Sequence, residues 1–571
     1  MHSRDSTVHV ARPAQAPRPC PGRRAGRRTL ASALLALAGT LSAAGASIQV
    51  SAGLPFSDVS FTTTRPRLSP DGLFAVYRQD AVTDGGFDLW SVRTDGGAAP
   101  VRLSNPLASG QGQFLTFEIS PDGARVVYAV DQETAGKTEL YSVPIAGGAL
   151  TRISMNMASD RDVIGFRISP TSDRVFYYSD RYAWTQYDLY SVPIDGPGAA
   201  SVRLNPTLFQ ESDVDGFEVS PDGETVVYRA GRNSTGVYRL YSVPAIGGDP
   251  LLLQDAQAPT GVQSYFRITP DGNRVLYLID TTVDGAFDLY SVPIAVAAPE
   301  LLTTGLAAGH SVESSFLVRS DSTRVVFRAA TAAAQTFHLF SVPVAGGTVV
   351  RLNGVLASTE DVEPLFSISP NGSRVVYSSD EDANDIFDLW TVPIDGGARI
   401  RLNSALAPGG DLLEHAISAD GTRVVYLADQ AADGLHELWS VPIGGGTVTK
   451  LNRTLVFAGD AKAFRISSNS AWVVYGADQD TDEVDELLVV PIAGGAVEDL
   501  NDPLVAGGDV SLKFIQTVLF DLAANGRVVV YPADQTVDSQ IELYTARLPG
   551  FAIFLDGFGS GDLSAWSVGV F

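Results

Sequence analysis

The sequence predicts an all-β fold, a β-propeller of ten four-stranded blades. A segment of about 50 residues recurs ten times along the chain, which is the mark of a repeat architecture. Each copy holds four short apolar stretches separated by turn residues, and the chain contains 55 Gly and 32 Pro. Four short strands per repeat with apolar residues on both faces describe a blade packed between two neighbours.

The most regular part of each repeat is a turn of the form Ser-Pro-Asp-Gly, degenerate in several copies. It begins at Ser69, Ser120, Ser169, Ser220, Thr269, Arg319, Ser369, Ser418, Ser467 and Ala523. The spacing is even and no linker interrupts it, which favours one ring of ten blades. Ten exceeds the usual 4 to 8 blades, so two smaller rings are the alternative.

One unit shows how each strand is predicted. Residues 117–120 form a first strand, which ends at the turn 120–123, where Pro sets φ and Gly accepts a positive φ. Residues 125–130 are almost continuously apolar, so we expect a second strand buried on both faces. Residues 139–145 form a third strand, whose Pro marks a bulge or the strand's end. After a Gly-Gly turn, residues 150–154 form the fourth strand.

Two further positions recur within the strands. The third strand carries an aromatic residue at one position in most units, and we expect it to pack between blades: Trp90, Tyr141, Tyr190, Tyr241, Tyr290, Phe340, Trp390, Trp439 and Tyr544. The fourth strand usually carries a basic residue, as expected for an outer edge that must not pair with other chains. These are Arg102, Arg152, Arg203, Arg351, Arg401 and Lys450.

The ends of the repeat array predict how the ring closes. The tenth unit reaches its third strand at residues 541–544 and then lacks the Thr-Arg-Leu-Asn stretch of a fourth strand. Residues 47–50 precede the first unit with the spacing of a fourth strand. We therefore expect the mature N-terminus to complete the last blade. The competing interpretation is that residues 551–554 supply this strand.

Residues 1–46 have the pattern of a cleaved secretory signal peptide. Four arginines between residues 23 and 28 precede an apolar run from 30 to 41, which ends at the small residues 44–46. The run is too short to span a bilayer. The single cysteine, Cys20, lies within this segment, so the mature chain has no disulfide. We expect an exported, periplasmic or extracellular protein without membrane insertion.

Acidic residues gather in two kinds of loop. The formal net charge of −25 makes nucleic acid an improbable partner and favours cations or basic partners. Strand alternation sends the loop after each second strand and the loop entering each first strand to the same face of the ring. Asp-rich loops make good turns. They also offer oxygen ligands for calcium in units seven to nine. The candidate calcium ligands are Asp380, Asp382, Asp385, Asp429, Asp433, Asp478, Asp480 and Asp482.

The repeat resembles the TolB-type, WD-like propeller repeat, on units such as Ser220-Pro221-Asp222-Gly223 and strands such as Asp288-Leu289-Tyr290. The resemblance covers residues 47–550 and implies that the strand leading into Ser-Pro-Asp-Gly is innermost. Residues 551–571 form a separate tail. Its stretch from Asp556 to Ser567 resembles a C-terminal segment of secreted bacterial proteins, although Gly559 stands where members carry an acidic residue.

The sequence favours a binding protein over an enzyme. No Gly-x-Ser-x-Gly elbow is present, and the four histidines after residue 46 are scattered without metal-ligand spacing. We expect a non-enzymatic scaffold that binds a protein or peptide partner on its acidic loop face, with no cofactor and with calcium as the one candidate ion. The alternatives are a propeller enzyme acting on polysaccharide and a calcium-stabilised surface or adhesive protein.

Overall fold

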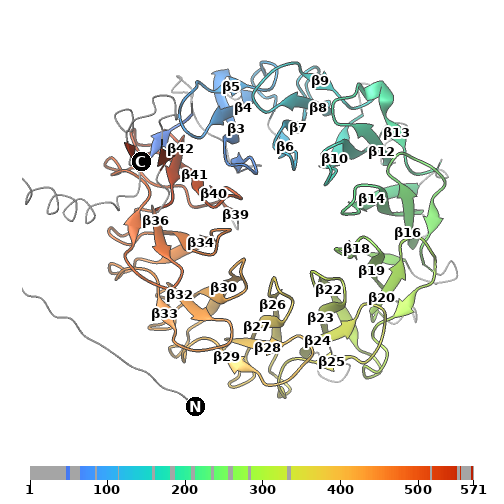
Figure 1. Ribbon diagram of the computed structural model, residues 1–571, viewed down its shortest axis with the longest axis vertical. Helices are drawn as coiled ribbons and strands as arrows, with labels where there is room; N and C mark the ends of the chain where they lie inside the picture. The colour runs from blue at the N-terminus through green and yellow to red at the C-terminus, as the bar shows by residue number, and fades with distance from the viewer. Residues whose placement is uncertain are drawn as a thin grey trace, which may run out of the picture.

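The chain forms a single ring in the computed structural model (Figure 1). The structure describes residues 47–51, 65–83, 86–112, 115–156, 161–180, 187–206, 212–232, 237–254, 261–280, 285–330, 336–514, 517–549, 553–554 and 568–569. The predicted signal peptide and most of the C-terminal tail lie outside the described residues. Within the described residues, no helix combines the length and the apolar character needed to cross a bilayer.

Ten four-stranded antiparallel sheets make up the ring, numbered here as blades 1 to 10 in the order of their second strands. The predicted ten-blade propeller in one ring is confirmed. The first strands, which lie nearest the centre of the ring in Figure 1 as the resemblance implied, are β2 (Arg67–Leu68), β6 (Thr116–Ile119), β10 (Val163–Ile168), β14 (Ser212–Val219), β18 (Val262–Ile268), β22 (Ser311–Val318), β26 (Val362–Ile368), β30 (Leu412–Ile417), β34 (Ala461–Ile466) and β40 (Asp521–Leu522).

The second and third strands form the middle of every blade. The second strands are β3 (Phe74–Thr83), β7 (Arg125–Val130), β11 (Arg174–Ser179), β15 (Thr225–Arg232), β19 (Arg274–Ile279), β23 (Arg324–Ala330), β27 (Arg374–Ser379), β31 (Arg423–Ala428), β35 (Trp472–Ala477) and β41 (Val528–Ala533). The third strands are β4 (Gly86–Arg93), β8 (Glu139–Pro144), β12 (Asp188–Pro193), β16 (Val237–Pro244), β20 (Asp288–Pro293), β24 (Phe337–Pro343), β28 (Asp388–Pro393), β32 (Glu437–Pro442), β36 (Glu486–Pro491) and β42 (Glu542–Arg547). Most third strands end at the repeated proline, which confirms the strand-end interpretation.

The fourth strands are short and lie at the outer edge of each sheet. They are β5 (Val101–Arg102), β9 (Thr151–Arg152), β13 (Val202–Arg203), β17 (Leu251–Leu252), β21 (Glu300–Leu301), β25 (Val350–Arg351), β29 (Ile400–Arg401), β33 (Thr449–Lys450), β37 (Glu498–Asp499) and β1 (Ile48–Gln49). The remaining elements are η1 (Gly198–Ala200) and two strand pairs, β38 (Lys513–Phe514) with β39 (Thr517–Val518) and β43 (Ile553–Phe554) with β44 (Val568–Gly569).

The ring closes through the N-terminal segment, as the sequence predicted. β1 pairs antiparallel with β42 of blade 10, with Ile48 opposite Thr545 and Gln49 opposite Tyr544. The competing strand, β43, pairs with β44 instead. Residues from opposite ends of the chain therefore share one sheet, and β1 serves as a clasp.

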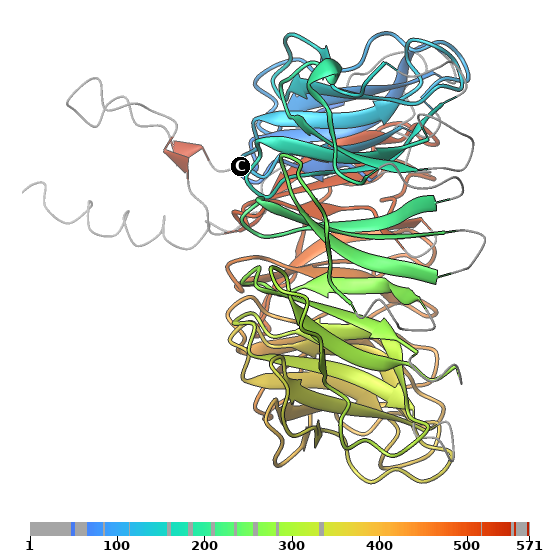
Figure 2. The same cartoon turned by 90° about the vertical axis from the view of Figure 1, so that its right-hand side faces the viewer.

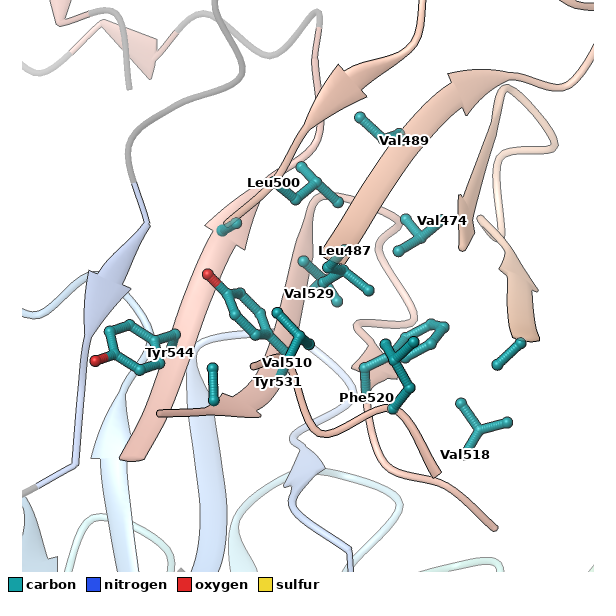
Figure 3. Close-up of a cluster of buried hydrophobic side chains, with 14 of the residues drawn as sticks. Val474, Leu487, Val489, Leu500, Val510, Val518, Phe520, Val529, Tyr531 and Tyr544 are labelled. Carbon is teal, nitrogen blue, oxygen red and sulfur yellow. The ribbon is translucent and has the colours of Figure 1, made fainter. Parts of the chain in front are cut away.

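Apolar side chains fill the space between neighbouring blades. In the cluster shown in Figure 3, residues of blade 9 such as Val474 and Leu487 pack against Val529 and Tyr531 of blade 10. The aromatic residue of the third strand stacks on an aromatic residue of the second strand within the same sheet. The Tyr128–Tyr141 ring centroids, for example, are 5.5 Å apart. Both tyrosines also belong to one buried cluster with Val76 and Leu89 of blade 1, so the expected packing between blades is confirmed for these rings.

Seen from the side, the turns and loops gather at the two faces of the ring (Figure 2). The turn face carries the Ser-Pro-Asp-Gly and Gly-Gly turns. In these turns the Asp carboxylate closes the hairpin, as where Ala124 donates its N–H to Asp122 Oδ1 at 3.0 Å. The loop face carries the loops after the second strands and the loops entering the first strands.

The basic residues of the fourth strands neutralise an acid that opens the third strand of the same sheet. Arg152 Nη1 lies 3.3 Å from Glu139 Oε1, and Lys450 Nζ lies 2.8 Å from Glu437 Oε1. Equivalent pairs are Arg102–Asp88, Arg203–Asp188 and Arg401–Asp388. The predicted edge position is confirmed, and the charge has a partner inside the blade.

Candidate functional site

The acidic residues of the loop face fall into an inner and an outer set. The inner set joins neighbouring blades, as blades 6 and 7 illustrate. Phe337, at the start of β24, donates its N–H to Asp361 Oδ1 at 2.6 Å. Asp361 in turn donates its N–H to Asp380 Oδ1 at 2.6 Å, and Asp385 donates to Asp380 Oδ2 at 3.1 Å. We call this chain of hydrogen bonds the acid latch.

The acid latch recurs around the ring. The carboxylate at the end of the second strand accepts two hydrogen bonds. One comes from the backbone N–H of the acid in the loop that leads into the first strand, and the other comes from the backbone N–H of the residue five positions after the carboxylate. Asp429 and Asp478 do this in blades 8 and 9, and Asp534 does it in blade 10. These carboxylates are buried. Their oxygens satisfy backbone N–H groups that would otherwise be orphaned in the loops.

Blades 4 and 6 lack the acid at the end of the second strand and use arginine instead. Arg229 donates from Nε to the carbonyl of Val262 in blade 5 at 2.7 Å, and its guanidinium carbon lies 3.9 Å from the centroid of the Tyr238 ring. Arg328 contacts the carbonyl of Val362 in blade 7 in the same way. The two departures from the acidic pattern therefore have a structural cause, since a cation on the second strand replaces the carboxylate as the link to the next blade.

The outer set of acids points into solvent. Five acids of this set are exposed: Asp382, Asp433, Asp480, Asp482 and Asp538. Of the predicted calcium ligands, Asp380, Asp429 and Asp478 are thus latch residues, and Asp382, Asp433, Asp480 and Asp482 are outer residues. Asp385 lies between the two sets, with its backbone N–H in the latch. No group of three or more His, Cys, Asp or Glu in the described part of the chain is placed to hold a metal ion. Calcium binding at these loops stays a prediction.

Exposed apolar side chains accompany the outer acids on blades 9 and 10. Phe457, in the loop entering blade 9, is 97 % exposed, and Val537, beside Asp538, is 53 % exposed. Val505 lies against the same loop as Asp538, since its N–H donates to the carbonyl of Gln535 at 3.2 Å. An apolar patch rimmed by polar residues marks an interaction surface, whereas a single exposed apolar residue does not identify one by itself. We call Phe457, Val537 and the five outer acids the loop-face rim.

A second set of charges lies on the first strands, two residues before the repeated turn. We call these residues the charged belt. Starting at blade 9 and crossing the closure to blade 5, they alternate in sign over seven consecutive blades: Arg465, Asp521, Arg67, Glu118, Arg167, Glu218 and Arg267. Blades 6, 7 and 8 carry uncharged residues at this position: Leu317, Ser367 and Ala416.

The acids of the charged belt join neighbouring blades. Glu118 accepts the N–H of Ile168 at 3.0 Å, Glu218 that of Ile268 at 2.8 Å, and Asp521 that of Leu68 at 3.1 Å. Burial raises the pKa of the Glu118 and Glu218 carboxyls, while the donated N–H groups and neighbouring arginines oppose the rise. Each acid of the belt therefore has a structural role.

The arginines of the belt differ among themselves. Arg267 Nη1 forms an ion pair with Glu218 Oε1 at 2.6 Å. Arg67 and Arg167 are exposed and lie on either side of Glu118, whose carboxylate feels both charges. Within the described part of the chain, no side-chain hydrogen bond or ion pair joins Arg67 or Arg167 to another residue.

Two hollows lie along the belt at the turn-face end of the first strands. One, of about 420 Å³, is lined by Arg67, Pro70, Phe117, Glu118, Arg167 and Asp521. The other, of about 550 Å³, is lined by Arg167, Phe217, Glu218, Pro221, Phe266 and Arg267. Arg167 belongs to both, so the hollows adjoin. Sequence reasoning missed this site, although the alternation of Arg and Glu at one repeat position was visible in the sequence.

The histidines do not converge. His310 Nε2 lies 2.9 Å from Asp288 Oδ1, and His415, where most units have Phe, bonds Ser367 Oγ at 3.1 Å. A serine beside an imidazole is the geometry of an activated nucleophile. Burial, however, lowers the pKa of His415 to about 4, so the ring is a poor proton acceptor. His415 fits the role of a neutral core residue.

Blade 9 breaks the charge pattern of the outer edge. Asp499 replaces the basic residue of the fourth strand and faces Glu486, the acid that opens the third strand. Burial, together with Asp480 and Asp499, raises the pKa of the Glu486 carboxyl to about 7. Arg453 pairs with Asp480 at 3.3 Å and with Asp499 at 3.0 Å. The folded chain therefore favours the protonated form of Glu486.

This arrangement predicts a pH-dependent stability. A raised pKa means that the folded state loses stability as pH rises from about 4.3, the value expected for an unfolded Glu, towards 7. Glu486→Gln should therefore stabilise the protein by about 1 to 2 kcal/mol at pH 8 and have no effect near pH 4. Thermal melts of both proteins across this range check it. Glu437→Gln in blade 8 is the matched control. This substitution removes the ion pair of Glu437 with Lys450, so it should lower the stability of the protein at pH 8, where Glu486→Gln raises it.

Comparison with known proteins finds solved structures of low sequence identity, with TM-scores below 0.5. No protein-family model matches the chain, and no curated protein matches it either. A protein provisionally assigned as TolB from Agrobacterium tumefaciens is 19 % identical over 53 % of this chain and 95 % of its own, with a TM-score of 0.27. Oligogalacturonate lyase from Vibrio parahaemolyticus is 13 % identical over 68 % of this chain and 98 % of its own, with a TM-score of 0.35.

Dipeptidyl peptidase 4 from Porphyromonas gingivalis is 12 % identical over 84 % of this chain and 65 % of its own, with a TM-score of 0.46. These similar structures include both enzymes and a protein assigned as TolB. The class of this protein is therefore set by its own ten sheets, which define a β-propeller of the kind the TolB-type repeat implied. None of these likenesses assigns an activity to the chain.

Proposed function

We propose that the protein is an exported, non-enzymatic scaffold that binds a protein or peptide partner on its loop face. The observation that supports this most is the loop-face rim. The inner acids form the acid latch, whereas the outer acids are exposed on the same face, where Phe457 and Val537 are also exposed. An anchor residue of apolar character with a charged surround is the usual anatomy of an interface.

The charge of the rim indicates the kind of partner. Five exposed carboxylates on blades 7 to 10 of a chain with net charge −25 attract a basic segment and repel acidic ones. Such attraction between exposed charges weakens as the ionic strength rises. The partner we expect is a protein or peptide with basic residues next to an apolar one.

The test is capture from an envelope extract with residues 47–571 as bait. A rim variant, Phe457→Ser with Asp433→Asn, Asp482→Asn and Asp538→Asn, runs in parallel. Asp195→Asn with Asp249→Asn is the control, because these acids follow third strands on the turn face. We expect the wild type and the control to retain one and the same protein, less of it at high salt, and the rim variant to lose it. Equal capture by the rim variant would contradict the proposal.

A further inference from the structure

The charged belt contains residues that the fold does not explain. Its acids each bind a backbone N–H of the next blade, and Arg267 neutralises Glu218. Arg67 and Arg167 have no such contact among the described residues and keep their guanidinium donors exposed. A guanidinium group offers five donors in a planar fork that suits a carboxylate. These two arginines therefore remain available to a ligand.

We propose that the two hollows of the charged belt bind an extended peptide segment in which acidic and basic residues alternate. Its carboxylates would pair with Arg67 and Arg167. This site lies at the turn-face end of the first strands and is separate from the loop-face rim. The inference therefore goes beyond the partner-binding function proposed above.

The local charge favours such a ligand. Including Arg65, which lies 3.9 Å from Asp521, the belt region carries more arginines than acids, although the whole chain is strongly acidic. An acidic group is thus attracted to the guanidinium groups of Arg67 and Arg167. Around the hollow of about 420 Å³, Arg65, Arg67 and Arg167 outnumber Glu118 and Asp521, so one further anion completes the charge balance.

The shape of the site suits an extended chain rather than a compact ligand. The hollows of about 420 and 550 Å³ adjoin at Arg167 and follow the first strands of successive blades. Phe117 and Pro70 line one hollow, and Phe217, Phe266 and Pro221 line the other. These apolar walls offer burial to the side chains between the charged ones.

Because the charges of the belt alternate in sign, the site should bind a peptide of alternating charge in preference to a polyanion. Glu118 and Glu218 stand between the arginines and would repel successive carboxylates of an acidic polysaccharide or an all-acidic peptide. A peptide in which Glu and Lys alternate presents each belt residue with the opposite charge. We therefore expect it to bind more tightly than either polyanion.

The experiment measures fluorescence anisotropy of three labelled probes with residues 47–571. The probes are a short peptide of alternating Glu and Lys separated by Ser, an all-Glu peptide of the same length, and an oligogalacturonide. We expect the alternating peptide to bind best, and Arg67→Ser with Arg167→Ser to weaken it about tenfold or more. Arg67→Lys with Arg167→Lys should restore part of the affinity, because it restores charge without the fork.

Two controls make the result specific. Arg351→Ser changes an exposed arginine on the outer edge strand and should leave binding unchanged, as should the loop-face rim variant. Thermal melts establish that each variant is folded. Unchanged affinity in a folded Arg67→Ser/Arg167→Ser variant overturns the proposal, as does tighter binding of either polyanion. Because the rim variant is measured with the same probes, failure here is distinct from failure of the loop-face proposal.

Discussion

Removing residues 47–51 from a chain that starts at residue 47 should open the ring and cost on the order of 5 kcal/mol of stability. These residues supply the fourth strand of blade 10, so their loss leaves the third strand, β42, as an exposed edge. Val50, which is 3 % exposed, belongs to the core shared by blades 10 and 1. Its N–H donates to the carbonyl of Leu543 at 2.8 Å.

The side chains of the clasp add contacts that a generic strand would lack. Ser51 Oγ accepts the N–H of Leu543 at 3.0 Å, and Ser47 Oγ donates to Asp502 Oδ2 at 2.9 Å. The clasp joins segments almost 500 residues apart, so its loss releases a very large loop. We expect the melting transition to move to lower temperature and to broaden, as blades next to the closure unfold first.

Point substitutions distinguish the stability contributed by the clasp from a general effect of shortening the chain. Val50→Asp buries a charge in the core between blades 10 and 1 and should reproduce most of the loss. Gln49→Ala is the control, because the Gln49 side chain is exposed and only its bond with Glu542 is lost. It should change stability by less than about 1 kcal/mol. A sharp, unshifted melt for the chain without residues 47–51 would show that the ring does not depend on the clasp.

The fold could be predicted from the sequence because the turn residues, the apolar stretches and the repeat spacing all indicate the same structure. The turn residues fix the hairpin, the apolar run of Arg125–Val130 fixes the buried second strand, and a missing fourth strand after residue 544 requires a replacement from elsewhere in the chain. The clasp could be predicted for the same reason, since Ile48 and Gln49 stand one repeat spacing before the first unit. Repetition turns a weak local signal into a strong one.

The candidate sites could be predicted only in part, because the same residue type serves two purposes. Asp380 and Asp382 are two positions apart in one loop, yet Asp380 is buried in the latch and Asp382 faces solvent. Composition cannot separate them, since the difference lies in which backbone N–H groups the fold brings near. The charged belt is harder still to predict from the sequence, because Arg67 and Glu118 become neighbours only when the first strands gather at the centre of the ring.

Asp380→Ala should destabilise the protein by about 3 kcal/mol, because it leaves the backbone N–H groups of Asp361 and Asp385 without their acceptor. Asp380 is 1 % exposed and accepts from Asp361 and Asp385, and through Asp361 it joins β24 of blade 6 to blade 7. Asp380→Asn keeps one carbonyl oxygen and should lose about half as much. Thermal and denaturant unfolding in chelator-treated buffer measure both effects.

Asp382→Ala is the matched control, since this neighbouring acid is exposed and its nearest cation, Arg401, is 3.9 Å away. An exposed pair at that distance contributes less than about 1 kcal/mol. Repeating the melts with added calcium separates the latch from the calcium hypothesis. The latch requires that Asp380→Ala lose stability without calcium. Calcium binding by these loops requires in addition that calcium raise the melting temperature of the wild type and that Asp380→Ala diminish this rise. A loss that appears only in the presence of calcium would contradict the latch, because backbone N–H donors need their acceptor whether or not an ion is present.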